Sequence, residues 1–193
     1  MKRLFFIIFI SITMAFTKTG FNSTQVIITP SSKLLVKGKT NVNSFKCEYD
    51  VLKLKNPIPV FFKKFNDKII FDNTNLVLEN VNFDCGGLGI NNDFQDLLKT
   101  KTHPKIVITV KEITQCTDAH KNFEAFIDLT IAGISKPYVM PIEFQENGSI
   151  FIKGNLSLNI RDFNLEPPKK ALGLIVVKDV IEIDFQLAIK EAI

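Results

Sequence analysis

Strict alternation of apolar and polar residues near the C-terminus constrains this chain more than any other feature. Two alternating runs lie between Ser149 and Leu187, on either side of a loop that contains Pro167 and Pro168. A period of two places successive side chains on opposite faces of a strand. One face is apolar throughout: Ile150, Ile152, Gly154, Leu156, Leu158 and Ile160, then Ile181, Ile183, Phe185 and Leu187. Each run is therefore predicted to be a strand whose uncharged face lies against a core or an apolar ligand.

Similar runs cover the rest of the chain. They span residues 45–54, 76–85, 105–111, 123–131 and 138–144, with shorter apolar runs at 25–29, 32–37 and 68–71. Asn92 and Asp93 can cap a short helix over residues 94–99, and Asn147-Gly148 suits a type I′ hairpin turn. The pattern predicts an all-β fold of roughly eight to ten short strands with one short helix, arranged as a sandwich or an up-and-down barrel. A single domain over residues 22–193 is expected.

The first residues have the features of a removable export signal. Lys2 and Arg3 precede the apolar run Leu4 to Ile12, and Thr13-Met14-Ala15 offers small residues at the cleavage spacing. The apolar run is too short for a membrane anchor, since a span needs about 20 residues. We therefore expect a signal peptide at residues 1–15 and a periplasmic or secreted mature protein.

Composition argues against nucleic-acid binding. The formal net charge is +4, and loss of Lys2 and Arg3 would leave +2 (4 − 2). This charge is small, and the lysines are spread along the predicted strands instead of being clustered. Hydrophobic residues make up 46% of the chain, including 18 Phe, which is enough to form a core and also to line a cavity.

Short motifs along the chain resemble those of the YceI-like family. Each motif is weak alone, but their order and spacing across Ser32 to Leu187 are fairly specific. The motifs are Ser32-Lys33-Leu34, Gly38 to Val42, Phe45-Lys46-Cys47, Asp93-Phe94 with Leu97-Leu98, His103 to Ile106, Leu129 to Gly133 with Ser135-Lys136, Asp162-Phe163 with Pro167-Pro168, and Val176 to Leu187.

The resemblance implies a fold and a function. The fold would be an extended, lipocalin-like antiparallel β-barrel of about eight strands with one short helix. The protein would be an exported, non-enzymatic carrier that holds a polyisoprenoid, an isoprenoid quinone or another long-chain amphiphile inside the barrel. Such a role needs no cofactor beyond a bound isoprenoid or fatty-acyl lipid, and it leaves room for transient contact with a membrane surface. The oligomeric state stays open.

The apolar faces of the predicted strands supply the candidate ligand-binding residues. They are Tyr49, Phe123, Ile127, Leu129, Tyr138, Met140, Phe144, Leu156, Leu158 and Phe185. A barrel of about eight strands can hold one ligand or can be filled by its own side chains. In the second case these residues would only pack against one another, and the protein would be a cargo-free structural or interaction module of the cell envelope.

Three cysteines leave their pairing open. Cys47 and Cys85 both lie in strand-like runs among large apolar residues. Because disulfides persist in exported proteins, we hypothesise a bridge between them, with Cys116 unpaired. The alternative is three buried thiols that act as small hydrophobic side chains.

Polar residues offer little for catalysis or metal binding. Cys116, Asp118 and His120 have alternating spacing, but a solvated loop explains them better than a metal site. The only other histidine is His103, and no catalytic constellation is apparent, so neither a catalytic nor a metal site is predicted. Arg161 and Asp162 are expected to form a charge pair, with Asp162 also capping backbone amides; the functional alternative is that Arg161 contacts a polar ligand head group.

Overall fold

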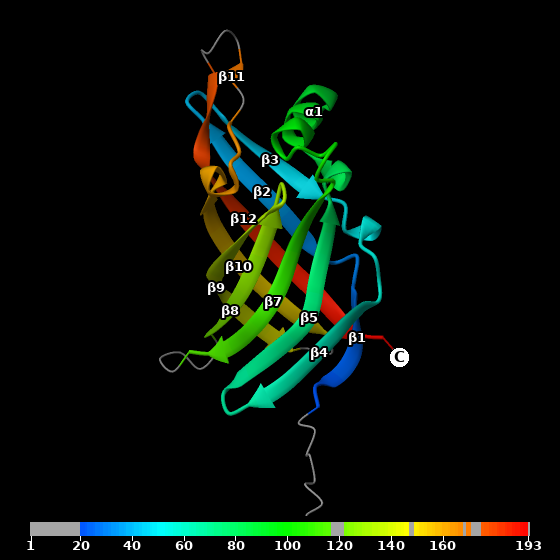
Figure 1. Ribbon diagram of the computed structural model, residues 1–193. Coiled ribbons are helices and arrows are strands. Elements are labelled where there is room, and N and C mark those ends of the chain that lie inside the picture. Colours follow the sequence, from blue (N-terminus) through cyan, green and yellow to red (C-terminus); the bar gives the residue numbers. More distant parts are fainter. Residues whose placement is uncertain (1–19, 117–121, 147–148, 168, 171–174, 193) are drawn as a thin grey trace, which may run out of the picture.

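Antiparallel strands dominate the computed structural model of the chain (Figure 1). The structure describes residues 20–116, 122–146, 149–167, 169–170 and 175–192. The strands are β1 (Asn22–Ile28), β2 (Lys33–Thr40), β3 (Ser44–Tyr49), β4 (Ile58–Phe65), β5 (Lys68–Glu79), β6 (Phe83–Asp84), β7 (Lys105–Gln115), β8 (Asn122–Ile131), β9 (Ile134–Glu146), β10 (Ile150–Asn159), β11 (Lys169–Lys170) and β12 (Ile175–Glu191). The helices are α1 (Leu88–Leu97) and the 3-10 turns η1 (Val51–Lys53), η2 (Asn80–Asn82) and η3 (Ile160–Phe163).

Eight of these strands close into a ring. The hydrogen-bonded order is β1-β4-β5-β7-β8-β9-β10-β12, and β12 returns to β1. One edge of β12 pairs with β10 along its length. The other edge pairs first with β2 and then with β1, because the chain bends between these two strands. The fold is thus an all-β antiparallel barrel, and the predicted class and strand number of the ring are confirmed.

Three further strands extend the sheet outside the ring. They leave from β12 in the order β2, β3 and β6. Since η2 joins β5 directly to β6, this extension returns to the ring. A disulfide between Cys47 of β3 and Cys85, just after β6, fastens it. The Tyr49 hydroxyl accepts hydrogen bonds from the Glu79 amide at 3.3 Å and from the Asn82 side chain at 3.4 Å. One end of the barrel is therefore fixed by a covalent bond and by side chains in addition to strand pairing.

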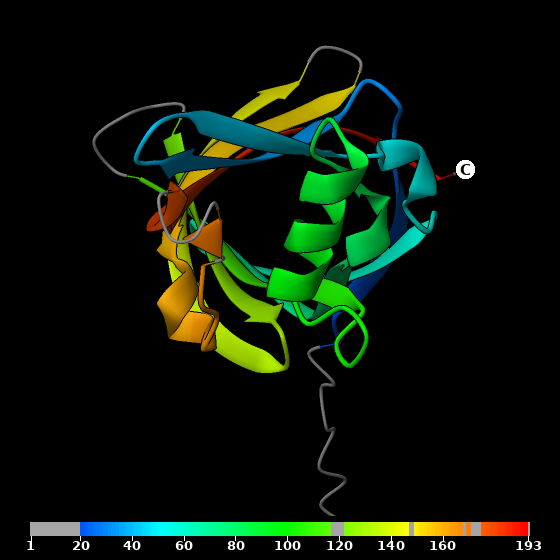
Figure 2. The same cartoon turned by 90° about the horizontal axis from the view of Figure 1, so that it is seen from above.

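The helix α1 lies across this same end of the barrel (Figure 2); we name it the helix end. Sequence reasoning placed the helix start near Phe94, which is wrong by about two turns, since α1 begins at Leu88. The Asn91 side chain explains the difference: it accepts a hydrogen bond from the Cys85 amide at 2.6 Å and donates one to Asp84 at 3.1 Å. These bonds tie the first turns of α1 to β6.

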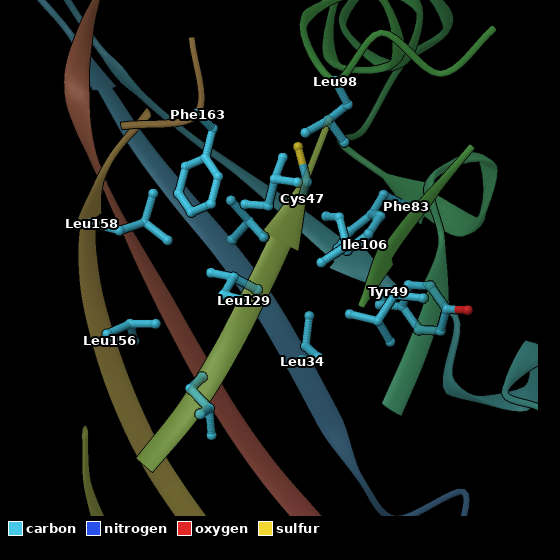
Figure 3. Close-up of a cluster of buried hydrophobic side chains, with 14 of the residues drawn as sticks. Leu34, Cys47, Tyr49, Phe83, Leu98, Ile106, Leu129, Leu156, Leu158 and Phe163 are labelled. Atoms are coloured by element: carbon cyan, nitrogen blue, oxygen red, sulfur yellow. The ribbon is translucent and has the colours of Figure 1, made fainter. Parts of the chain in front are cut away.

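The packed core also lies at the helix end. Figure 3 shows side chains from different elements meeting there, among them Leu129 of β8, Leu158 of β10 and Phe163 of η3. Leu129 is 1% exposed and Phe163 is fully buried. Phe94 of α1 packs edge-on against Phe83, with ring centroids 5.2 Å apart. The helix thus seals the barrel by adding its own apolar side chains to the core.

The disulfide should contribute measurably to stability. A loop of this size, with a sequence separation of 38 between the cysteines, predicts a loss of about 3–4 kcal/mol in the free energy of unfolding when the bridge is reduced. Denaturant titration with and without reductant measures the difference. The C116A variant, which leaves the bridge intact, should show the same response to reductant. Equal stability of the oxidised and reduced protein would contradict the prediction.

Candidate functional site

Cross-strand register shows which side chains face the barrel interior. Residues directly opposite each other on paired strands share a face. One such row runs Phe123, Ile142, Gly154, Phe185 and Leu34 across five strands. Phe185 lies across Gly154 in this row, since a side-chain carbon on Gly154 would stand 2.4 Å from the Phe185 ring. A larger residue at position 154 would therefore displace the ring.

Burial of the inward-facing residues changes along the barrel axis. At the helix end they are tightly packed, as Leu129 and Phe163 show. Toward the opposite end, where the β4–β5 hairpin lies (Figure 1), inward-facing side chains keep part of their surface accessible to water. We name this the hairpin end. The partly exposed inward residues there include Phe123, Phe144, Ile152, Leu187 and Ile189. Accessible apolar surface inside the barrel thus extends into the half that lacks the helix.

The ten candidate ligand-binding residues all face inward, but they differ in burial. Six are buried: Tyr49, Ile127, Leu129, Met140, Leu156 and Leu158. Four retain accessible surface: Phe123, Tyr138, Phe185 and Phe144, the last being 37% exposed. Ile152, Leu187 and Ile189 belong beside these four, although sequence reasoning did not select them. The only sequence signal for these residues is their alternation with polar neighbours. The tightly packed residues show the same alternation, so it cannot tell accessible positions from packed ones.

Phe123 and Phe144 mark the hairpin end of the interior. Their ring centroids lie 6.1 Å apart in an edge-to-face arrangement. They belong to the neighbouring strands β8 and β9, and the inward-facing residues of β8 and β10 carry no charge. An apolar chain lying along β8 and β10 in this half of the barrel would therefore meet hydrocarbon and aromatic surface.

Tyr138 lies where β9 and β10 separate. Strand pairing between them ends at Ile142 and Gly154, and η3 packs against both strands above that point. The Tyr138 ring stacks on Phe163 with centroids 6.2 Å apart, and its hydroxyl donates a hydrogen bond to Asp162 at 3.3 Å. Burial and the neighbouring Asp162 carboxylate raise the pKa of Tyr138 to about 12.

The expected pairing of Arg161 with Asp162 is wrong. Arg161 Nε lies 3.0 Å from an Asp179 carboxylate oxygen, and this partner raises the pKa of the guanidinium. The tight turn of η3 directs the two adjacent side chains to different neighbours, so Asp162 accepts from Tyr138 instead. The backbone amide of Arg161 is capped by Asn159, whose side chain accepts its hydrogen bond at 2.9 Å.

Two hollows lie on the outer side of the sheet. One, of about 470 Å³, is lined mainly by outward-facing residues of β2, β9, β10 and β12 and reaches Phe185. The other, of about 680 Å³, lies over β2, β3 and β12 and has four lysines and Glu182 in its wall. Of the ten candidate residues, only Phe185 lines either hollow, so both are distinct from the interior surface at the hairpin end.

Metal binding finds no support in the described ranges, where no three His, Cys, Asp or Glu side chains come together. Cys116 is a half-buried free thiol, whereas Asp118 and His120 lie outside the described residues. The His103 ring packs over Gly133, where an added side-chain carbon would meet it at 2.6 Å. Gly133 also has a φ of +79°, as the β8–β9 turn requires. Among the described residues, no helix has the length and hydropathy that crossing a membrane requires.

A closed antiparallel barrel, sealed at one end and with accessible apolar surface toward the other, defines a class of β-barrel suited to enclosing apolar groups. The sequence matches the YceI-like domain over residues 61–189, which is more than half of the chain. The chain therefore belongs to the YceI-like family. No curated protein sequence matches it.

Solved structures share the fold at low sequence identity. Burkholderia cenocepacia BcnA has a TM-score of 0.65 at 19% identity, over 85% of this chain and 99% of that protein. A polyisoprenoid binding domain from Saccharophagus degradans, implicated in plant cell wall breakdown, has a TM-score of 0.60 at 12% identity, over 89% and 99%. The Campylobacter jejuni YceI protein has a TM-score of 0.53 at 18% identity, over 69% and 80%.

Tyr138 predicts a dependence of stability on alkaline pH. Its folded-state pKa of about 12 lies above the ordinary value of 10.0, so its contribution to stability is complete below pH 10 and is lost as pH rises toward 12. Y138F should remove this part of the decline in unfolding free energy. Denaturant titrations of both proteins between these pH values measure it, and parallel pH profiles would refute the assignment.

Proposed function

We propose that this protein is an exported lipid-binding barrel that holds the apolar chain of a polyisoprenoid or another long-chain amphiphile. The observation that carries the proposal is the partly exposed, largely apolar inner surface at the hairpin end, opposite a tightly packed helix end. Phe123, Phe144 and Ile152 represent this surface. Membership of the YceI-like family and the fold shared with a polyisoprenoid binding domain support the same function.

The mechanism is passive sequestration. Each methylene group removed from water contributes about 0.8 kcal/mol, so a chain of about 20 carbons would bind strongly even after the entropic costs of association. The packed core around Leu129 would set the depth to which the chain can enter. A polar head group would stay near the hairpin end, in contact with water. Binding and release need no chemical step, so the proposed role is that of a carrier and not an enzyme.

Export is part of the proposal. The expected signal peptide at residues 1–15 lies outside the described residues. The disulfide between Cys47 and Cys85 supports an oxidising compartment such as the periplasm or the exterior of the cell. In either place, a carrier would keep a water-insoluble chain in solution.

Mass spectrometry of the mature protein, purified from its native compartment, tests the cargo directly. The expected result is a stoichiometric mass excess in the native spectrum, which organic extraction releases as a prenyl or acyl lipid. A bare polypeptide that stays bare after incubation with long-chain quinones and fatty acids would overturn the proposal. It would favour the alternative, a barrel filled by its own side chains that acts as an interaction module.

A charge placed in the inner surface should expel the cargo. Phe144 faces inward and is partly exposed, whereas Val139 lies on the same strand, faces outward and is also exposed. F144E should lower the lipid-to-protein ratio at least about tenfold, because a carboxylate would be desolvated beside the chain. V139E should leave the ratio unchanged. Equal ratios in both variants, with circular dichroism confirming that they fold, would place the lipid outside this part of the barrel.

A further inference from the structure

Exposed phenylalanines gather on the outer face at the hairpin end. Phe61 and Phe65 of β4 are 38% and 53% exposed, and Phe21, just before β1, is 43% exposed. Ser23 pairs with Phe61, which places Phe21 on the same outer face beside Lys63. Phe65 ends β4 and is paired with Lys68 across a two-residue turn, so it stands at the tip of the β4–β5 hairpin. Three aromatic side chains thus surround one corner of the barrel.

The charges of β4 are two lysines with no acidic residue. Lys63 and Lys64 lie between Phe61 and Phe65 in the sequence, with Lys63 on the outer face beside the rings and Lys64 on the opposite face near the tip of the hairpin. In the described part of the chain neither has an acidic partner within ion-pair distance, whereas the nearby Lys68 pairs with Glu112 at 2.9 Å. We name Phe21, Phe61, Lys63, Lys64 and Phe65 the aromatic rim. Its combination of apolar rings with unpaired cations suits the interface of an anionic bilayer.

The aromatic rim is continuous with the interior. Phe62, next to Phe61, faces inward and pairs with Phe71 of β5, and both keep accessible surface. From there the partly exposed inner surface continues around the hairpin end. An apolar chain leaving a bilayer at the rim would therefore meet the accessible rings of Phe62 and Phe71 as it enters the barrel.

We propose that the aromatic rim docks the hairpin end onto anionic lipid bilayers, where the cargo is taken up or released. The docking step rests on the proposed carrier function for its purpose, but its physical basis is the rim alone. A second copy of this protein would fit the aromatic rim less well than a bilayer. Two rims facing each other would bring their unpaired lysines together. A partner strand is also poorly suited, because β4 is already paired on both edges, with β1 and β5.

The absence of Trp from the chain permits a clean fluorescence test. F65W places a single reporter at the tip of the rim, and L88W places one at an exposed position of α1, at the helix end. With vesicles of phosphatidylethanolamine and phosphatidylglycerol, the emission of F65W should shift to shorter wavelength and that of L88W should not. An unchanged F65W spectrum, or an equal shift in both variants, would overturn the proposal.

Vesicle co-sedimentation supplies an independent measure. F61S/F65S should weaken binding about tenfold for each ring that no longer inserts, and K63Q/K64Q about fivefold for each lysine on vesicles that contain phosphatidylglycerol. L88S should bind as the unchanged protein does. Binding that is insensitive to both double variants would refute the rim as the docking surface.

The cargo experiment keeps the two proposals separate. A protein that carries extractable lipid but does not bind vesicles would overturn the docking surface and leave the carrier function intact. Rim-dependent vesicle binding by a protein that never acquires lipid would support the docking surface and overturn the carrier function.

Discussion

The pairing of β12 on both of its edges is the interaction on which the rest of the structure depends. This strand of 17 residues joins β10 on one edge and both β2 and β1 on the other. Its pairing with β1 closes the ring, and closure removes the free strand edges that an open sheet would present. Once the ring is closed, every inward-facing side chain must share one interior, and the packing of each is decided by what lies opposite.

Closure alone does not make the two ends of the barrel different; the segment between β5 and β7 does. It supplies η2, β6 and α1, together with Cys85 for the bridge to Cys47. Phe83 and Phe94 add their rings to the core at this end. No comparable segment in the described residues covers the hairpin end, so the apolar surface there remains accessible. The proposed carrier function and the proposed docking surface both follow from this asymmetry.

Much of the fold could be predicted from the sequence, because the alternation of side chains is a local property of each strand. The inward orientation of all ten candidate residues follows directly from it. The helix start was missed, since it depends on side-chain hydrogen bonds from Asn91 to Cys85 and Asp84, which the apolar periodicity does not report. The partner of Arg161 was missed for a similar reason: Asp179 is brought near only when β12 folds back along η3.

The sequence by itself determined the strands, their buried faces and the family resemblance. The tertiary structure alone decided which parts of those faces are packed and which are accessible. Leu129 and Phe144 have the same alternating context in the sequence. Leu129 is 1% exposed and Phe144 is 37% exposed, because side chains from η3, α1 and β3 fill the interior at one end and nothing described fills it at the other. Packing depends on contacts across the barrel, and no local pattern encodes them.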